Sequence, residues 1–313
     1  MTGDQRAFGQ LVEPYRRELI AHAYRLVGSS ADAEDVYQEA MLAAWRGRGT
    51  LRDPRALRSW LHTVTTRAGL RFVEKRGPRL PSWDEGGPHD PTKPLDPPAD
   101  GPWVEPFQDP DPAHVVERWE RLELAWIAAL QTLPPLQRAA ILLKDVLGYS
   151  SVEIAGMLET SPAAVNSALQ RGRDTLSSTP SEESLQTVGT GSVKEADRQA
   201  AERFARAFAA SDIDAIVELL NADVRFTMPP LPAWFKGIDD VRVFLELRVF
   251  ATPWQMIPLG DVNGYPAYLG MQWQHDAFRP GAVIIIHTFN GTVRWIATFV
   301  EPALVEQWAA RVQ

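Results

Sequence analysis

Three basic side chains, Arg67, Arg71 and Lys75, recur at four-residue steps and would share one face of a helix. Arg52 and Trp60 lie shortly before them. Cations in such a stripe contact phosphates, and a nearby aromatic ring can stack on an unpaired base. The pattern therefore predicts a surface that binds a melted nucleic-acid strand. A place in the helical core is the alternative role for Trp60.

A group of acidic side chains lies upstream, in the segment from Asp32 to Trp45. Asp35 and Glu39 are four residues apart with no Lys or Arg between them, so on a helix they repel each other mildly. A surface that tolerates this repulsion is typical of one that binds a basic protein partner. An acidic helix face that meets only solvent is the alternative.

The most specific local pattern is a pair of helix starts near residue 160. Ser150 and Glu153 have the spacing of a capping box, which predicts a helix beginning there. Ser161 is a good N-cap and Pro162 a good first residue for a second helix, which would run to about Leu176. Two short helices joined in this way are typical of a helix-turn-helix.

The second of these helices has one polar side. At about 100° per residue, Leu169 and Gly172 fall close to Val165, on the side that would face a core. The polar side chains that could reach base edges or phosphates in a DNA major groove are Asn166, Ser167, Gln170, Arg171 and Arg173. A plain helical hairpin with a solvated polar face is the alternative.

Two stretches divide the chain. Residues 77–112 contain eleven prolines, which predict an extended linker because proline interrupts helices and sheet interiors. An aromatic island, Trp103–Phe107, lies within it, either as an anchor on a neighbouring domain or as a docking element for the C-terminal part. Residues 179–194 are rich in Ser, Thr and Gly and predict a flexible tether.

The segments 1–76 and 113–178 both have apolar residues at three- and four-residue steps, which predicts two helical domains. In the first segment, this periodicity predicts a helix from Phe8 to Val27. Gly28 would end that helix.

The segment 195–313 predicts a domain of mixed α and β structure. A helical pattern from Glu195 to Leu220 comes first. Four runs rich in β-branched and aromatic residues then predict strands, at Val224–Met228, Ala267–Trp273, Ala282–Phe289 and Val293–Val300. The Asn290-Gly291 pair between the last two predicts a tight hairpin turn.

The composition limits the class of protein. The 313 residues include no cysteine, which excludes disulfides, thiolate metal sites and cysteine nucleophiles. No apolar run reaches the ~18–20 residues that span a membrane, so we expect a cytoplasmic protein without membrane contact. The net charge is −8, but residues 1–76 hold 13 Lys and Arg against 9 Asp and Glu, so a DNA partner is expected there first.

The helical segments together resemble proteins of the sigma-70 family. Asp32–Glu39 with Trp45-Arg46 resembles the helix by which that family grips the clamp of RNA polymerase. Trp60-Leu61 followed by Arg67–Arg76 is similar to the region that melts and reads the minus-ten promoter element. The stretches that look like the domain reading the minus-thirty-five element are Leu133–Arg138, Asp145–Ser150 and Ala164–Arg173.

The order and spacing of these motifs are those of the extracytoplasmic-function (ECF) class, and the resemblance covers residues 5–178. It implies polymerase contacts by Asp32, Asp35, Gln38 and Glu39. It implies contacts to the opened minus-ten strand by Arg52, Arg67 and Arg71. It implies contacts to the minus-thirty-five duplex by Asn166, Ser167, Gln170, Arg171 and Arg173. Family members often carry Asn and Asp where this chain has Arg67 and Arg71.

The C-terminal pattern resembles the SnoaL-like cone fold, shared with nuclear transport factor two and ketosteroid isomerase. Such a cone usually encloses an apolar pocket. The residues expected to line it are Phe226, Met228, Trp234, Trp273, His287 and Phe289, with Trp254, Met256 and Trp295 as further candidates. Enzymes of this fold place an acid or a histidine in the pocket as a base. Asp223, Asp261 and His287 are the candidates, but no paired acid/base spacing is visible, so we assign no catalytic residue.

We therefore predict a multidomain protein with two all-α helical domains and a C-terminal α+β SnoaL-like cone. The predicted function is that of a sigma factor that binds core RNA polymerase, at its clamp and flap, and promoter DNA. The C-terminal domain would regulate it, with a small-molecule ligand as a further expectation. We predict neither enzymatic activity nor a cofactor or metal.

Two alternatives remain. A stand-alone helix-turn-helix regulator would need neither the acidic helix nor the basic stripe. A SnoaL-like isomerase or hydrolase with a DNA-binding appendage would need a working base in the cone.

Overall fold

The computed structural model describes residues 3–77, 79–80, 87–99, 101–107, 124–177 and 194–312. The chain divides into two compact units. Unit 1 comprises residues 1–81 and 104–189, and unit 2 comprises residues 82–103 and 190–313. Residues 113–123 of the predicted second helical domain, and all of the predicted tether except Lys194, lie outside the described residues.

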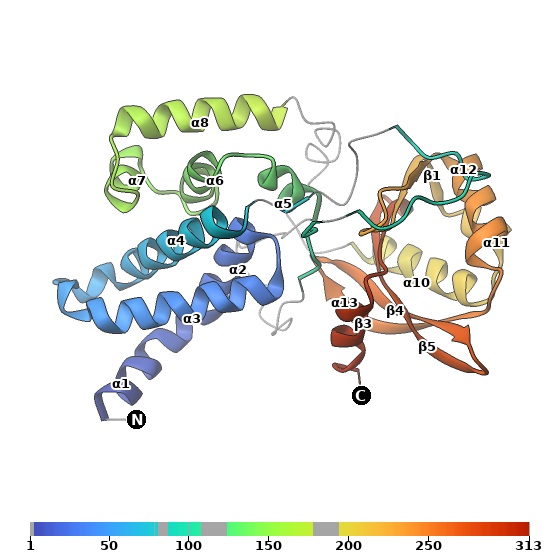
Figure 1. Ribbon diagram of the computed structural model, residues 1–313, viewed down its shortest axis with the longest axis horizontal. Coiled ribbons are helices and arrows are strands. Elements are labelled where there is room, and N and C mark those ends of the chain that lie inside the picture. Colours follow the sequence, from blue (N-terminus) through green and yellow to red (C-terminus); the bar gives the residue numbers. More distant parts are fainter. Residues whose placement is uncertain are drawn as a thin grey trace. The chain divides into compact units, whose positions relative to one another are not determined.

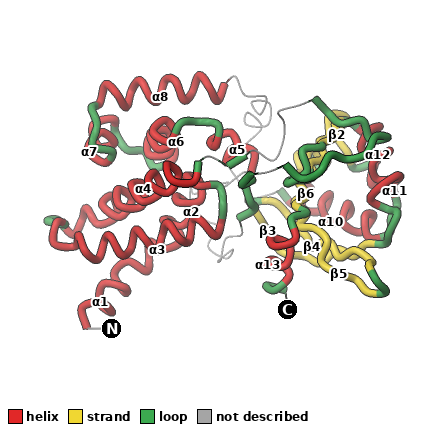
Figure 2. Tube along the Cα trace, viewed as in Figure 1, coloured by secondary structure: helices red, strands yellow, loops and turns green. Residues whose placement is uncertain are grey.

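Unit 1 is built from helices (Figures 1 and 2). The helices of its first part are α1 (Gly3–Val12), α2 (Arg16–Val27), α3 (Ser30–Gly47) and α4 (Leu57–Arg76), with short 3-10 turns at Glu13–Tyr15, Arg48–Thr50 and Pro54–Ala56. The helix predicted from Phe8 to Val27 is thus two helices. Pro14 lies in the turn between them, where its missing N–H interrupts the hydrogen-bond ladder.

The helices α2, α3 and α4 pack on one another around buried apolar side chains, among them Leu19, Val36 and Leu61. Gly28 ends α2 as predicted, with a φ of 72° that suits glycine. Ser29 then caps α3 by accepting a hydrogen bond from the backbone N–H of Asp32.

The helices of the second part of unit 1 are α5 (Leu124–Gln131), α6 (Pro135–Ile141), a π-helical turn (Leu142–Val146), α7 (Ser151–Met157) and α8 (Pro162–Ser177). The predicted capping box of Ser150 and Glu153 is confirmed. Ser161 Oγ accepts a hydrogen bond from the backbone N–H of Ala164 at 3.1 Å, which confirms the second helix start. The predicted helix-turn-helix is therefore α7 and α8.

Unit 2 has an α+β fold. Its helices are α10 (Glu195–Ala209), α11 (Ile213–Val217), α12 (Ile238–Phe244), a π-helical turn (Leu245–Val249) and α13 (Pro302–Ala309). Its strands are β1 (Leu220–Thr227), β2 (Trp234–Lys236), β3 (Trp254–Val262), β4 (Tyr265–Gln274), β5 (Ala277–Phe289) and β6 (Thr292–Phe299). They form one sheet in the order β2-β1-β6-β5-β4-β3, in which β1 and β6 are parallel and the other neighbours antiparallel.

The four predicted strands and the hairpin at Asn290-Gly291 are confirmed, whereas β2 and β3 were not predicted. Strand β3 contains Pro258 and Gly260, which weaken the strand pattern, and its pairing with β4 shifts register between them. One face of the sheet carries the main apolar core, to which α10 and α12 contribute Phe204, Phe208 and Phe244. Helix α13 packs against β4 and β5.

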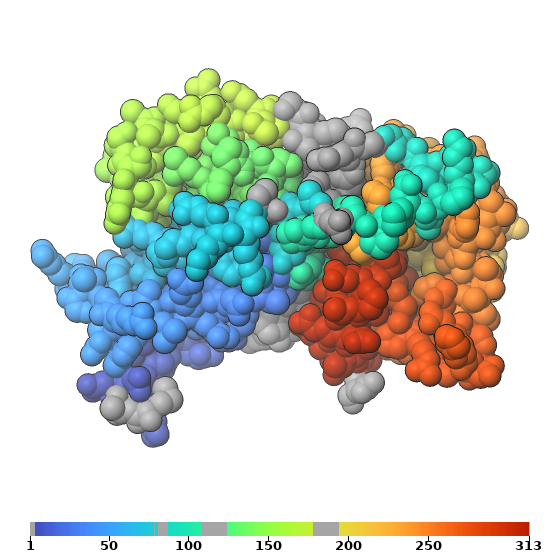
Figure 3. All heavy atoms as spheres, viewed as in Figure 1, coloured from blue at the N-terminus to red at the C-terminus, as the bar shows by residue number. Residues whose placement is uncertain are grey.

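The described part of the linker at residues 87–99 has no helix or strand, as expected, but it is attached to unit 2 (Figure 3). The backbone N–H of His89 donates to the carbonyl oxygen of Trp234 at 2.7 Å, and that of Ala99 to Pro230 at 3.0 Å. Leu95 packs on the main apolar core. These residues therefore dock on the C-terminal domain.

The described residues Val104–Phe107 of the aromatic island belong to unit 1. The ring of Phe107 stacks on Tyr24 of α2, with centroids 4.7 Å apart. The structure thus favours the anchor interpretation for this part of the island.

Candidate functional site

Helix α3 carries three of the four predicted polymerase-contacting residues on its exposed face. Asp35, Gln38 and Glu39 are all exposed. Leu42, one turn further along, is 58% exposed. The acidic face therefore also offers an apolar side chain that another protein could bury. The sequence did not single out Leu42, because its exposure depends on which face of α3 packs inward.

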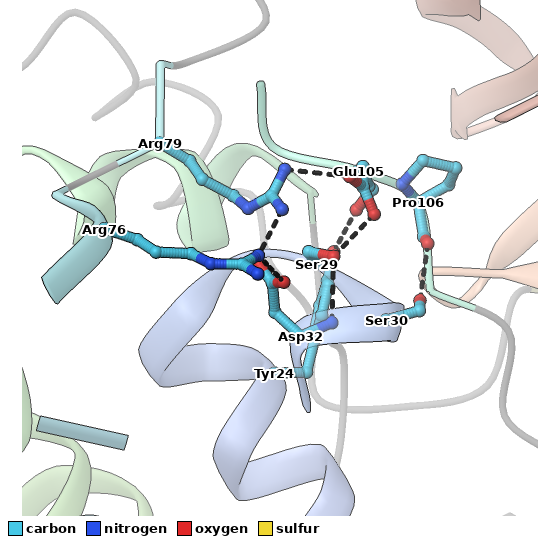
Figure 4. A network of polar contacts seen from close by, with 8 residues as sticks. All are labelled: Tyr24, Ser29, Ser30, Asp32, Arg76, Arg79, Glu105 and Pro106. Carbon is cyan, nitrogen blue, oxygen red and sulfur yellow. Dashed lines mark hydrogen bonds and ion pairs between the residues drawn. The ribbon is translucent and has the colours of Figure 1, made fainter. Parts of the chain in front are cut away.

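Asp32 does not belong to this exposed face, contrary to our prediction. Its side chain is only 8% exposed and pairs with Arg76 Nη1 at 2.7 Å and Arg79 Nη2 at 2.5 Å (Figure 4). Because both carboxylate oxygens are occupied inside unit 1, Asp32 holds the end of α4 against the start of α3 and is not available to a partner.

Arg67 makes contacts that the sequence did not predict. Its Nε donates to the carbonyl oxygen of Met157 at 2.8 Å and its Nη2 to that of Gly156 at 3.3 Å. Its Nη1 pairs with Glu159 at 2.8 Å. Gly156 and Met157 end α7, where carbonyl groups lack partners within the helix and carry a partial negative charge. Arg67 therefore ties α4 to the helix-turn-helix.

The other predicted minus-ten contacts are more accessible. Arg71 is exposed and lies 3.5 Å from Glu39, a separation at which an exposed ion pair contributes little. Arg52 is also exposed, and Trp60 is half-buried. Of the three predicted minus-ten contacts, Arg67 is thus engaged within unit 1, whereas Arg71 and Arg52 are exposed.

The polar side of α8 is largely exposed, as the helical periodicity predicted. Asn166, Ser167, Gln170 and Arg171 all face solvent. Asn166 Oδ1 accepts a hydrogen bond from Ser151 Oγ at 2.7 Å, which positions it at the start of α7. The fifth predicted residue of this set is less free than the others.

Arg173, the fifth residue, is exposed but paired with Asp145 at 2.5 Å. This ion pair and its hydrogen bond raise the pKa of the guanidinium above its usual value. Arg173 would have to leave Asp145 before it could contact a phosphate.

A buried arginine joins the two parts of unit 1. Arg138 of α6 is 1% exposed and donates to the carbonyl oxygen of Leu26 in α2. It also donates to Gln131 Oε1 at 2.5 Å and to the carbonyl oxygen of Leu133 at 3.1 Å. Burial lowers its pKa to about 10, so it is still charged at neutral pH. In the sequence, Arg138 was noted only as the last residue of the Leu133–Arg138 stretch. Its burial was not predicted, because the neighbouring residues in the sequence do not show whether an arginine is buried.

A second buried polar group lies between α2 and α4. His62 Nε2 is 2.5 Å from Glu18 Oε1, and Arg58 pairs with the same carboxylate at 2.7 Å. Burial opposes ionisation of Glu18, but hydrogen bonds from His62 and Arg58 outweigh it and lower its pKa. His22 is hydrogen-bonded to Thr66 at 2.8 Å, and burial with the nearby His62 holds its pKa well below the usual value.

The residues predicted to line a pocket in the cone lie on both faces of the sheet. Phe226 and Met228 belong to the apolar core beneath α10 and α12. His287 is the register partner of Trp295, and Trp295 Nε1 donates to Thr227 Oγ1 at 2.9 Å. Because Thr227 follows Phe226 in β1, its side chain points to the opposite face. His287 therefore faces away from Phe226.

The other three predicted residues do not complete a pocket either. Trp234 is the register partner of Thr227, which places it on the same face as Thr227. Trp273 is 38% exposed and makes an edge contact with Phe278. Phe289 lies beneath the guanidinium of Arg294.

The three candidate bases, His287, Asp261 and Asp223, do not form a catalytic group. Burial lowers the pKa of His287 to about 3, and its ring stacks on Trp295 at 4.2 Å. Asp261 is held by both guanidinium nitrogens of Arg198, at 2.9 and 3.0 Å. Asp223 is exposed. This arrangement does not favour the isomerase or hydrolase alternative.

An open groove of about 420 Å³ lies elsewhere in unit 2, between α10 and strands β3 and β4. Its lining includes Arg198, Glu202, Arg206, Met256 and Tyr268, so Met256 is the predicted pocket residue that it contains. Within the described ranges, no cluster of side chains suits a metal ion. Among all the residues that the structure describes, no helix is long and apolar enough to cross a membrane.

Comparisons with known proteins agree with this organisation. The family models Sigma-70 region 2 and Sigma-70, region 4 match residues 11–79 and 123–176. The ECF RNA polymerase sigma factor SigG of Mycobacterium tuberculosis is 35% identical over 305 residues, which cover 95% of this chain and 82% of SigG. SigJ of the same species is 33% identical over 216 residues, which cover 69% of this chain and 62% of SigJ. The crystal structure of SigJ matches with a TM-score of 0.60 at 28% identity and covers 94% of this chain and 96% of that one.

The two family-model matches, one in each helical part of unit 1, define a protein of the sigma-70 class. The chain belongs to the extracytoplasmic-function RNA polymerase sigma factors. It is a transcription initiation factor with a C-terminal SnoaL-like α+β domain, as the sequence predicted.

Proposed function

We propose that this sigma factor binds the clamp of core RNA polymerase through the exposed face of α3, and the flap through its helix-turn-helix domain. Asp35, Gln38 and Glu39 supply negative charge for a basic partner, and Leu42 supplies an apolar contact. Because core polymerase and promoter DNA are cytoplasmic in bacteria, we place the protein there too.

We propose that α4 and α8 read the two promoter elements. Arg52 and Arg71 would contact the opened minus-ten strand, and Arg67 would join them after leaving α7. The exposed side of α8 would contact the minus-thirty-five duplex through Asn166, Ser167, Gln170, Arg171 and, once free of Asp145, Arg173.

The contacts of Arg67 support a closed, inactive arrangement of unit 1. Elements about 25 base pairs apart lie ~85 Å apart along DNA, at 3.4 Å per base pair. Hydrogen bonds from Arg67 hold α4 directly against α7. Since directly packed modules cannot reach two such distant elements at once, the two parts of unit 1 must separate before a promoter is bound.

Run-off transcription with purified core polymerase tests the polymerase contact. Replacing Asp35 and Glu39 with arginine should lower core binding and transcription at least tenfold, because the exposed acidic face becomes basic. The matched control reverses two exposed charges of unit 2, Glu301 and Glu306, and should leave both unchanged. Wild-type binding by the α3 variant would refute the assignment.

We also propose that the C-terminal domain regulates transcription by holding the linker, because residues 87–99 pack on it. Leu95→Asp should release this segment from the apolar core and change run-off transcription at least threefold. Pro94→Asp adds the same charge at an exposed neighbour and should have no such effect. Equal transcription by Leu95→Asp and the wild type would remove the proposal.

We propose the groove beneath α10 as the expected small-molecule site, because Met256 lines it and the other predicted pocket residues do not come together. Its lining combines the exposed Arg206 with the apolar Met256, which suits a small carboxylate with an apolar body. Thermal-shift screening of such acids against wild type and Arg206→Ala tests this, and a stabilisation unchanged in the variant would contradict it.

A further inference from the structure

One hydrogen bond joins the start of α7 to the exposed side of α8. The hydroxyl of Ser151 donates to Asn166 Oδ1 at 2.7 Å, across fifteen positions of sequence. This is the usual length of such a bond. Asn166 is the fifth residue of α8, in the part of a recognition helix that faces base edges. A residue outside α8 therefore contacts a side chain that is assigned to DNA.

The start of α7 does not depend on the Ser151 hydroxyl, because Ser150 and Glu153 form its capping box. The hydroxyl has one hydrogen and gives it to Asn166, so it cannot donate to a DNA phosphate at the same time. Ser151 is thus a positioning residue for Asn166 and not itself a contact to DNA.

Packing on the opposite side of α8 holds the backbone of Asn166. Val165 and Leu169 are buried. A Cβ atom at Gly172 would lie 2.7 Å from Ile141 Cδ1, so α8 lies directly against α6 there. Because packing holds the helix in place, the side-chain torsions of Asn166 decide which of its polar groups faces DNA.

The terminal amide of Asn166 can face a base in two ways. Its oxygen accepts hydrogen bonds and its nitrogen donates two. A rotation of ~180° about the last side-chain bond exchanges the two groups. In the major groove, O6 of guanine and O4 of thymine are acceptors, whereas N6 of adenine and N4 of cytosine are donors. An asparagine that nothing holds can therefore meet either kind of base.

We propose that Ser151 sets the base preference of Asn166, because it holds the amide oxygen and leaves the amide nitrogen to face DNA. This inference rests on the proposed function. The preferred partner is a keto base, guanine or thymine, whose oxygen accepts a hydrogen from Asn166 Nδ2. An amino base, adenine or cytosine, would oppose that donor with its own donor and leave both unpaired.

The contact differs in one respect from the ion pair of Arg173. Asp145 binds the guanidinium group that would contact a phosphate, so that pair must break before DNA is bound. Ser151 binds only the acceptor of Asn166, and the donors of the amide remain for DNA. The Ser151 contact can therefore persist in the promoter complex. An amide that is ordered before binding also loses less conformational freedom on binding.

The test is promoter selection with core polymerase and the full chain. A library randomised across the minus-thirty-five element is selected with wild type and with Asn166→Ala. The base pair whose preference flattens in Asn166→Ala is the one that Asn166 reads. Run-off transcription is then measured from the four promoters that differ only at that base pair, with wild type, Ser151→Ala and Ser151→Thr. Ser177→Ala is the matched control, because it removes an exposed hydroxyl at the end of α8.

Wild type and Ser177→Ala should favour the keto bases at that position by about tenfold, as expected for a well-placed base contact. Ser151→Thr keeps the hydroxyl and should keep the preference. Ser151→Ala should favour keto bases by less than about threefold, because the released amide can turn to meet an amino base. Preferences at the other minus-thirty-five positions should not change. Each value is a ratio within one variant, so a partial loss of folded protein cancels.

Full preference in Ser151→Ala would overturn the inference, as would a wild-type preference for adenine or cytosine at that position. Equal relaxation in Ser151→Thr would overturn it too. The same holds for relaxation of every position together, since Ser151 would then support the whole domain and not one side chain. If neither Asn166→Ala nor Arg171→Ala changes any preference, the proposed function of α8 itself is refuted.

Discussion

Removal of the Arg67 side chain should open unit 1. Arg67 contacts the end of α7 through two backbone carbonyl groups and Glu159, and Arg67→Ala deletes all three contacts. The contact of Arg138 with α2 remains and still holds the two parts together, so the open state should become more populated without the closed state being abolished.

The magnitude follows from the geometry of these contacts. The side chains of Arg67 and Glu159 are 37% and 75% exposed, so their ion pair contributes little. The hydrogen bond to Met157 is short, whereas the one to Gly156 is 3.3 Å long and weak. A charged donor contributes ~1.5–3 kcal/mol when buried, so about 1–2 kcal/mol is reasonable for this partly exposed group. That corresponds to a factor of ~5–30 in the ratio of closed to open molecules.

Single-molecule energy transfer measures this ratio directly. The chain has no cysteine, so dyes can be attached at Glu74→Cys on α4 and Asp174→Cys on α8 without other changes. Arg67→Ala should enlarge the low-transfer population and raise the apparent affinity for core polymerase by up to ~5–30-fold, because only open molecules are competent to bind.

Lys75→Ala is the control for the loss of one positive charge on α4, since Lys75 is exposed. Its transfer distribution should match that of the wild type. An unchanged distribution in Arg67→Ala would refute the closed arrangement as a state held by this residue.

Three further predictions concern other residues. Arg138→Ala should destabilise the chain by ~3–5 kcal/mol, because buried carbonyl groups lose their charged donor; a loss below about 1 kcal/mol in thermal unfolding would contradict this. His287 has a pKa of about 3 when folded against 6.5 when unfolded, so the folded state binds fewer protons. Stability should therefore be full above pH 6.5 and fall by up to ~1.4 kcal/mol per pH unit below it, and unfolding at pH 7 and 5 should show a smaller pH effect in His287→Leu. Leu42→Ala should weaken core binding ~3–10-fold with unchanged stability, as expected for an exposed interface residue; wild-type affinity in a pull-down titration would exclude Leu42 from the interface.

The sequence alone determined those features of this protein that depend on residues close together in the chain. The capping box of Ser150 and Glu153, the cap at Ser161 and the turn at Asn290-Gly291 each depend on residues within a few positions of one another. The same holds for the polar side of α8, because helical periodicity alone places those residues. Family membership followed from the order of such local patterns.

Tertiary structure decided which of the predicted residues are accessible. Asp32, expected on an exposed face, is buried by Arg76 and Arg79, more than forty residues away. Arg67, expected on DNA, contacts α7 some ninety residues further along.

The linker and the cone show the same dependence on distant packing. The linker was read as a spacer, yet Val104–Phe107 lie on α2 and α3, and residues 87–99 lie on the C-terminal domain. In the cone, the sequence predicted that both His287 and Phe226 line one pocket, but the strand register places their side chains on opposite faces of the sheet. The physical reason is common to all of these cases: burial and pairing of a side chain depend on packing partners far away in the chain, and spacing along the sequence does not encode them.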